Sequence, residues 1–271
     1  MSLNDHGFLR LDVERIRSGI VARHKVYFDL AYKVNDFCQQ TKFRLPIHSK
    51  DGPEVVAASL LLKMLCDFQA AIIVLERGLV LQGQELLRCA LEAFFFVRQV
   101  ANEPEFAATW AKSDEIDRKR AFEAVKAGAA GLPPGVGAEE LEAKLAEVKA
   151  RIEADTIKRL WLTDIKTETD WQSGLYAHWS LAVHSAPRSV EVYLDKGPPG
   201  SGIKGLKWGP SEEDLDFTLG MGVGIILAAW EPISRIYRIE VRAEVDALDA
   251  KLRALLAPTL GDLPQGRRED Q

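Results

Sequence analysis

The stretch Gln82–Ala101, QGQELLRCALEAFFFVRQVA, decides the fold of this chain. At about 100° per residue, its leucines, alanines, phenylalanines and valines cover most of the circumference of a helix. The remaining arc carries one polar stripe, formed by Glu85, Arg88, Glu92 and Gln99 at positions i, i+3, i+7 and i+14. Because a helix that is apolar on most sides must be surrounded by other elements, we expect it at the centre of a bundle.

Arg88 has two interpretations. If the stripe is the solvent-exposed side of the helix, Arg88 forms exposed ion pairs with Glu85 and Glu92. Each such pair stabilises the helix by about 0.2–0.5 kcal/mol. If other helices cover the stripe, Arg88 becomes an anion-binding guanidinium that carboxylates hold against a pocket. The sequence leaves both interpretations open.

A second apolar helix precedes the central stretch. It begins near Pro53, because proline suits the first turn of a helix. Gly78 and Gly83 punctuate the link that follows it. We therefore expect Pro53–Leu81 and Gln82–Ala101 to form an antiparallel helical hairpin at the centre of the molecule.

Helical patterns fill most of the remaining chain, so the predicted fold class is all-α, a mainly helical bundle. One small β-hairpin is expected near residues 189–209, where SVEVYL and IKGLKWGP flank the turn DKGPPGSG. We expect a single domain over residues 1–271, with 105–160 as a projecting helical arm and 258–271 as a frayed tail. The expected outer helices are residues 8–40, 105–127, 138–160, 171–185, 211–232 (with an N-cap at Ser211) and 234–256.

The composition is that of an ordinary globular protein, with 47% hydrophobic and 28% charged residues. The net charge of −5 provides no general attraction to nucleic acid or to an acidic membrane. The longest uncharged apolar run, Phe217–Trp230, is shorter than the roughly 20 residues that a membrane span needs. We expect neither a membrane nor a nucleic acid as partner.

The three cysteines, Cys38, Cys66 and Cys89, lie far apart in apolar helical patterns. An odd number without a C-x-x-C pair indicates buried thiols in a reducing compartment. The first residues do not resemble a signal peptide. We therefore expect a cytoplasmic protein.

A second polar cluster lies in residues 176–188, YAHWSLAVHSAPR. Tyr176, Ser180 and His184 are spaced i, i+4, i+8 and share one face of a helix. Such a line can bind a ligand or transfer protons, with His184 as the candidate catalytic residue. Alternatively, His184 only stabilises the helix C-terminus before Pro187, and the two hydroxyls are satisfied core groups.

Familiar metal, cofactor and catalytic motifs are absent from the sequence. His178 and His184 point to different helix faces, and no cysteine or carboxylate pair completes a metal-ligand set. The sequence contains neither a G-x-S-x-G elbow nor a phosphate-binding loop, and Gly220-x-Gly222-x-Gly224 lacks the spacing of a dinucleotide fingerprint. We expect no metal and no cofactor.

Several short motifs occur in an order that resembles a known family. LLRCALEAFFF (86–96) follows a glycine-punctuated turn, NEPEF (102–106) comes next, the Tyr-x3-Ser-x3-His helix follows, and IKGLKWGPSEEDL leads into the last helices. The order is similar to a family of uncharacterised prokaryotic proteins, domain of unknown function 5677, across roughly residues 50–240. The resemblance implies an all-helical fold and a bacterial source, and it supplies no reaction. By this resemblance, the positions that match the polar pattern of the family are Arg88, Glu92, Tyr176, Ser180 and His184.

A wider likeness is to helical HEPN-type ribonucleases, which carry Arg-x4–6-His on a helix. Arg17 and His24 fit this spacing. About one such match is expected by chance in a chain of this composition, so the motif carries little weight. The negative net charge does not support a nuclease either.

From these features we predict a cytoplasmic binding protein without catalysis. Its site would use Arg88, Glu92, Tyr176, Ser180 and His184 to bind a small anionic ligand or a partner. One alternative is a HEPN-like, metal-independent ribonuclease, toxin or phage-defence protein, with His184 or His24 as acid/base and Arg88 stabilising phosphate. Another is a homodimeric scaffold that pairs through its charged arm or through a small-residue face, formed by Gly220, Gly224 and Ala228.

Overall fold

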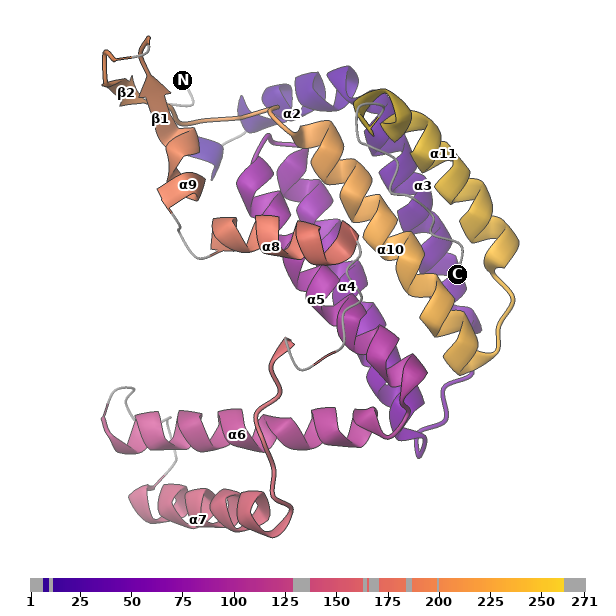
Figure 1. The fold of residues 1–271 in the computed structure, drawn as a ribbon, viewed down its shortest axis with the longest axis vertical. Helices are drawn as coiled ribbons and strands as arrows, with labels where there is room; N and C mark the ends of the chain where they lie inside the picture. The colour runs from indigo at the N-terminus through magenta and orange to yellow at the C-terminus, as the bar shows by residue number, and fades with distance from the viewer. Residues whose placement is uncertain are drawn as a thin grey trace, which may run out of the picture.

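The computed structural model shows a helical bundle built around two long apolar helices (Figure 1). These are α4 (Gly52–Leu75) and α5 (Val80–Asn102), joined by a tight turn at Gly78 and packed along their length. A third helix, α10 (Leu215–Tyr237), packs against both. The structure describes residues 7–9, 12–128, 137–162, 165, 171–183, 187–198 and 200–260.

Three further helices, α2 (Asp12–Arg23), α3 (Lys25–Thr41) and α11 (Arg242–Leu260), lie on the outer side of the central helices. Both α3 and α11 contact α10. The core that they enclose is continuous and dominated by large apolar side chains, and the largest of those with almost no exposure include Trp179, Trp230, Phe28, Phe68 and Phe95.

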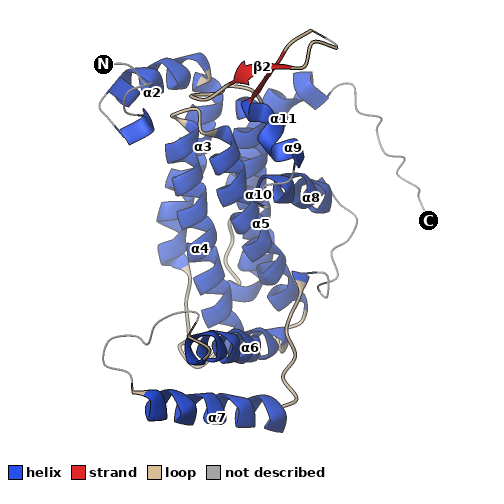
Figure 2. Ribbon diagram, turned by 90° about the vertical axis from the view of Figure 1, so that its left-hand side faces the viewer, coloured by secondary structure: helices blue, strands red, loops and turns tan. Residues whose placement is uncertain are grey.

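Two helices extend away from the bundle at the end where α5 finishes. Figures 1 and 2 show α6 (Phe106–Lys126) and α7 (Ala138–Ala154) side by side beneath the bundle. Ion pairs join them on the exposed side, including Lys126 to Glu142 at 2.8 Å. The arm is thus a two-helix unit that touches the body through α4 and α5.

Helix α8 (Trp171–Val183) crosses α5 and leads to a region of short elements. This region contains the hairpin, β1 (Leu194–Lys196) and β2 (Ile203–Leu206), in which Leu194 pairs with Leu206. The short helical elements of the chain are η1 (Gly7–Leu9), η2 (Lys42–Arg44), α9 (Pro187–Val190) and η4 (Glu191–Tyr193).

The predicted all-α fold with one small hairpin is confirmed, but the predicted strand over SVEVYL is wrong. Residues 187–193 form α9 and η4, and only Leu194–Lys196 pairs with β2. Alternating apolar residues specify a strand only where a sheet face is buried. Val190, Val192 and Tyr193 are exposed, so no buried sheet face enforces that alternation.

Two predicted helix boundaries also differ from the structure. The expected helix 8–40 is divided at His24, the N-cap of α3, with φ −104° and ψ 25°. The helix expected to end at Pro232 continues to Tyr237 and stops at Arg238, whose φ is +53°. Proline removes one helical hydrogen bond, and the buried neighbour Ile233 shows that core packing offsets this loss.

The start of α10 is also corrected, because its N-cap is Asp214 and not Ser211. Within α10, the predicted small-residue surface lets other helices of the same chain come close. A Cβ atom on Gly220 would meet the Leu256 side chain of α11 at 2.8 Å, and one on Gly222 would meet Leu87 of α5 at 2.9 Å. The glycine positions of this face are therefore covered within one chain.

Helices α4 and α10 are long and apolar enough to cross a membrane by length and composition alone. Core helices of a bundle meet the same criterion, and both helices pack in the bundle core here. Half of the most apolar window of α4 is buried, and the other half consists of partly exposed and exposed residues.

The cysteines differ in their surroundings. Cys38 is buried, accepts a hydrogen bond from Trp230 Nε1 at 3.2 Å, and has its pKa raised to about 12 by burial. Cys89 is half-buried. The expectation of buried thiols is wrong for Cys66, which is exposed because it lies on the outer side of α4.

Candidate functional site

The side chain of Arg88 on α5 lies beneath α8 and is only 13% exposed. Its Nε donates to Ser180 Oγ at 3.1 Å, and its Nη2 donates to Tyr176 Oη at 2.5 Å. Its Nη1 lies 3.5 Å from Glu92 Oε2. The structure therefore brings together four of the five predicted site residues, and the fifth, His184, lies outside the described residues.

All three nitrogen atoms of the Arg88 guanidinium have partners within the chain, and the Tyr176 ring covers the group at 4.7 Å. Ser180 is itself oriented by donating to the Tyr176 carbonyl at 2.7 Å. This geometry makes Arg88 a clamp that fixes α8 on α5. Ligand binding by these four residues stays a prediction.

A second arginine joins the same two helices. Arg98 of α5 donates from Nη1 to Gln172 Oε1 of α8 at 3.1 Å. Its guanidinium carbon lies over the rings of Phe94 and Phe95 at 5.4 and 5.3 Å. This contact was not among the predictions from the sequence, although an arginine directly after FFFV is a visible signal.

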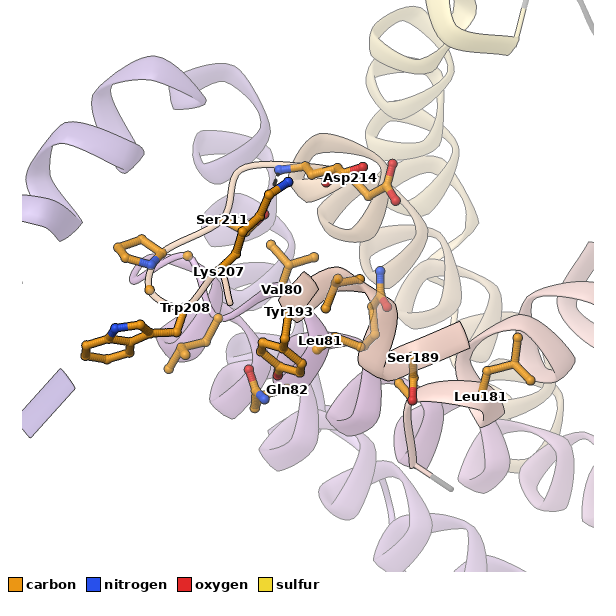
Figure 3. Close-up of a pocket in the computed structure, with 18 of the residues that line it drawn as sticks. Val80, Leu81, Gln82, Leu181, Ser189, Tyr193, Lys207, Trp208, Ser211 and Asp214 are labelled. Atoms are coloured by element: carbon orange, nitrogen blue, oxygen red, sulfur yellow. Dashed lines mark hydrogen bonds between the residues drawn. The ribbon is translucent and has the colours of Figure 1, made fainter. Parts of the chain in front are cut away.

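A cavity of about 520 Å³ opens beside this clamp, at the N-terminal end of α5 (Figure 3). Its walls come from the α4–α5 turn, α8, the short elements before β1, and the segment between β2 and α10. Figure 3 shows Lys207 and Trp208 at one end, and Leu181 and Ser189 at the other. The volume falls in the range of small-ligand sites, roughly 300–1,000 Å³.

The floor of the cavity is the first turn of α5, where the amides of Val80, Leu81 and Gln82 begin the helix. The N-cap residue Leu79 provides no side-chain hydrogen bond, and the first turn contains no acidic residue. Within the described part of the chain, these three N–H groups have no acceptor. Such a helix end carries partial positive charge and donors that suit an anion.

The rim of the cavity carries charges of both signs. Lys207 is exposed and forms no ion pair with any described residue. Glu213 and Asp214 lie where α10 begins. Asp214 has φ +60°, a left-handed conformation that costs free energy in a residue other than glycine and is frequent at functional sites.

Gln84 provides a fixed polar group deeper in the cavity and is 8% exposed. Its Nε2 donates to Thr218 Oγ1 at 3.1 Å, and the Thr218 amide donates to the Asp214 carbonyl at 2.8 Å. This donation orients the Gln84 amide and leaves its Oε1 as an acceptor for a ligand donor.

One wall of the cavity is held in place by a close backbone contact. The Ser211 amide donates to the Gly78 carbonyl at 2.8 Å. A Cβ atom on Gly78 would meet the Pro210 Cβ at 2.8 Å and the Ser211 oxygen at 2.9 Å. Only glycine fits this approach, which also has φ +71°. The tight docking fixes the segment that carries Lys207 and Asp214 relative to the start of α5.

The model of the family described as "Family of unknown function (DUF5677)" matches residues 54–201, more than half of the chain. The chain belongs to this family. No curated protein and no solved structure is significantly similar to it. The matched span of this DUF5677 protein contains the complete Arg88 clamp and the cavity floor, and it ends before Lys207 and Asp214.

The family has no assigned reaction, so function must be argued from the site itself. Among the described residues of this DUF5677 chain, no group of three or more histidine, cysteine and carboxylate side chains could hold a metal ion.

The two residues of the HEPN-like motif lie in separate ion-pair clusters, Arg17 on α2 and His24 at the N-cap of α3. Arg17 donates to the buried carboxylate of Glu76, which also accepts from the Tyr32 hydroxyl at 2.5 Å. The His24 ring nitrogens lie 2.7 Å from Asp216 and 2.9 Å from Glu212. Carboxylates of the chain already pair with both residues, so this arrangement gives a nuclease function no support.

Proposed function

We propose that this DUF5677 protein binds a small ligand with one anionic group and an aromatic or other apolar body in the cavity at the start of α5. The observation that carries the proposal is the coincidence of a 520 Å³ cavity with an uncapped helix N-terminus and Lys207. An anion at the helix end would accept from the free amides, and the Lys207 ammonium could reach the same group.

The rest of the cavity supports the apolar body of such a ligand. Tyr193 and Trp208 supply aromatic surface, and Val80 and Leu181 supply aliphatic surface. Aromatic walls with a few placed polar groups are typical of small-ligand sites. Glu213 and Asp214 at the rim would disfavour a second anionic group and would accept from amine or hydroxyl donors.

In this proposal, Arg88 is a positioning residue. Ser180, its hydrogen-bond partner, lies on the same helix as Leu181 and His178, which line the cavity. By holding α8 on α5, the clamp fixes one cavity wall without using its own donors on the ligand. The predicted polar cluster and the proposed binding site are thus neighbours along the α5–α8 contact.

The proposal can be tested with matched pairs of probes in a thermal-shift and calorimetric titration. The anionic probes are phenyl phosphate and indole-3-acetate, and their neutral partners are phenol and indole. We expect binding of an anionic probe and a loss of about 10- to 100-fold in affinity for Lys207→Met, which removes one charge-assisted hydrogen bond worth roughly 1.5–3 kcal/mol.

Lys204→Met is the matched control, because Lys204 is an exposed lysine of β2, three residues before Lys207, that does not line the cavity. This variant should bind like the wild type. Equal affinity in wild type and Lys207→Met, or no binding of either anionic probe, would refute the proposal.

A further inference from the structure

The outer side of α4 carries an exposed stripe that the cavity does not use. Val55, Leu62 and Ile73 are 38%, 50% and 54% exposed, high values for branched apolar side chains in a helix with an apolar core face. The stripe alternates steps of four and three residues. In order, the members of this α4 stripe are Val55, Ser59, Leu62, Cys66, Gln69 and Ile73.

This spacing is that of a helix–helix seam, in which side chains repeat every 3.5 residues on average. The other sides of α4 pack against α5, α10 and α3. Figure 2 shows α4 at the outside of the bundle. Five of the six stripe residues are exposed, whereas Gln69 is half-buried and donates from Nε2 to Asn35 Oδ1 of α3 at 2.8 Å. The stripe therefore has the pattern of a seam whose second helix is missing.

We propose that a second copy of this chain covers the α4 stripe. The two α4 helices would run antiparallel, and the twofold axis would cross the stripe midway between Leu62 and Cys66. In this register Val55 faces Ile73 of the second copy, and Leu62 faces Cys66 of the second copy. Ser59 faces Gln69 of the second copy, so each apolar position meets an apolar one and each polar position a polar one. Such self-complementarity is what a twofold interface requires.

Charge is consistent with this pairing. The stripe contains no charged residue, and the nearest cation, Lys63, already pairs with Asp67 of its own helix at 2.6 Å. Closing the interface would therefore bury no unpaired charge. The antiparallel arrangement also places opposite ends of the two helix dipoles together.

The size of the stripe predicts a reversible dimer. The stripe runs from Val55 to Ile73, and the 18 steps between successive residues, at a rise of about 1.5 Å each, give a length of about 27 Å. A second helix about 10–12 Å wide would therefore cover roughly 300 Å² of surface on each copy. The two copies together would bury roughly 600 Å², which is less than the roughly 1,000 Å² that a stable specific interface needs, so the association should be weak and transient. Monomer and dimer should therefore exchange with concentration.

The first test is sedimentation equilibrium of the full chain over a concentration series. We expect a wild-type dimer that dissociates on dilution, and at least a 10-fold weaker association for Leu62→Glu. The control is Val26→Glu, which places the same charge at an exposed apolar position of α3 outside the stripe and should leave association unchanged. A wild-type monomer at the highest soluble concentration would overturn the proposal.

The second test fixes the register by oxidative cross-linking. Leu62→Cys should form a disulfide-linked dimer with Cys66 of the second copy, because facing positions of a close helix pair approach disulfide distance. Leu62→Cys combined with Cys66→Ser should not cross-link. Cross-linking of this double variant would contradict the antiparallel register, and vesicle binding by a monomeric wild type would show that lipid covers the stripe instead.

Discussion

The guanidinium of Arg88 lies 4.7 Å over the ring of Tyr176 and also donates to that residue's hydroxyl at 2.5 Å. One pair of residues thus joins α5 to α8 through a cation–π contact and a charge-assisted hydrogen bond. This double contact places the charged group at a helix crossing, where the Tyr176 ring covers it and the Tyr176 hydroxyl accepts one of its hydrogen bonds.

The clamp predicts a stability loss on truncation of Arg88. Arg88→Met leaves the hydroxyls of Tyr176 and Ser180 without their donor, so the free energy of unfolding should fall by about 2–3 kcal/mol. Tyr176→Phe keeps the ring and should cost about 1 kcal/mol. Urea denaturation measures both, with Glu92→Gln as a control that changes stability by less than about 0.5 kcal/mol. Full stability of Arg88→Met would show that the clamp is not structural.

The backbone contact at the cavity wall predicts a strong effect at Gly78. Gly78→Ala must move Pro210 and Ser211 or leave its φ of +71°, so the free energy of unfolding should fall by about 1–3 kcal/mol. Gly174→Ala is the control, because Gly174 lies in α8 with nothing near its Cβ position. This control should be neutral or stabilising by up to about 1 kcal/mol. Equal thermal unfolding of both variants would refute the predicted close contact.

The left-handed backbone of Asp214 predicts opposite effects of glycine and alanine at this position on the free energy of unfolding. Its left-handed conformation suits glycine better, so Asp214→Gly should raise the free energy of unfolding by up to about 1 kcal/mol or leave it unchanged. Asp214→Ala should lower it by about 1 kcal/mol. If Asp214→Gly proves less stable than Asp214→Ala in thermal unfolding, this residue has a structural role beyond its backbone conformation.

The contact between α2 and the start of α10 predicts an acid-dependent loss of stability. Arg23 donates twice to Glu212, at 2.7 and 2.6 Å, and this contact, with help from His24, lowers the pKa of Glu212 from 4.5 to about 2. The unfolded chain therefore takes up this proton first as the pH falls. The stability that Glu212 contributes is complete above its unfolded pKa and is lost as the pH falls from 4.5 to about 2.

Chemical denaturation of wild type and Glu212→Gln at several pH values tests this dependence. The wild type should be the more stable protein at pH 6, and the difference should shrink toward pH 2. A difference that stays constant over this interval would mean that Glu212 does not titrate as the ion pair requires.

The sequence identified the central helices because apolar residues surround them at helical spacing, a pattern that few other structures satisfy. It also placed Tyr176 and Ser180 on one face, and that face does meet Arg88. The prediction of a strand over SVEVYL is wrong because β-branched residues favour a strand only where they pack in a sheet. The predicted helix end at Pro232 is wrong because the packing of α10 in the core stabilises the helix beyond the proline.

The cavity could not have been identified from the sequence in the same way. Its floor at Val80 and its rim at Lys207 lie far apart along the chain, and no local pattern links them. The approach of Ser211 to Gly78 brings these regions together, and it depends on the complete tertiary arrangement. Local periodicity reveals which faces are buried, whereas a binding site formed by distant segments needs the fold itself.

The most direct test of the central claim is a titration of the indole N–H resonances by NMR. Trp208 lines the cavity and Trp161 does not, and the two side chains are similarly exposed, at 52% and 53%. Assignment by Trp208→Phe and Trp161→Phe allows both signals to be followed during addition of indole-3-acetate or phenyl phosphate. The account predicts a saturable shift of the Trp208 signal with little change at Trp161. An unmoved Trp208 signal at saturating concentrations of both probes would contradict it.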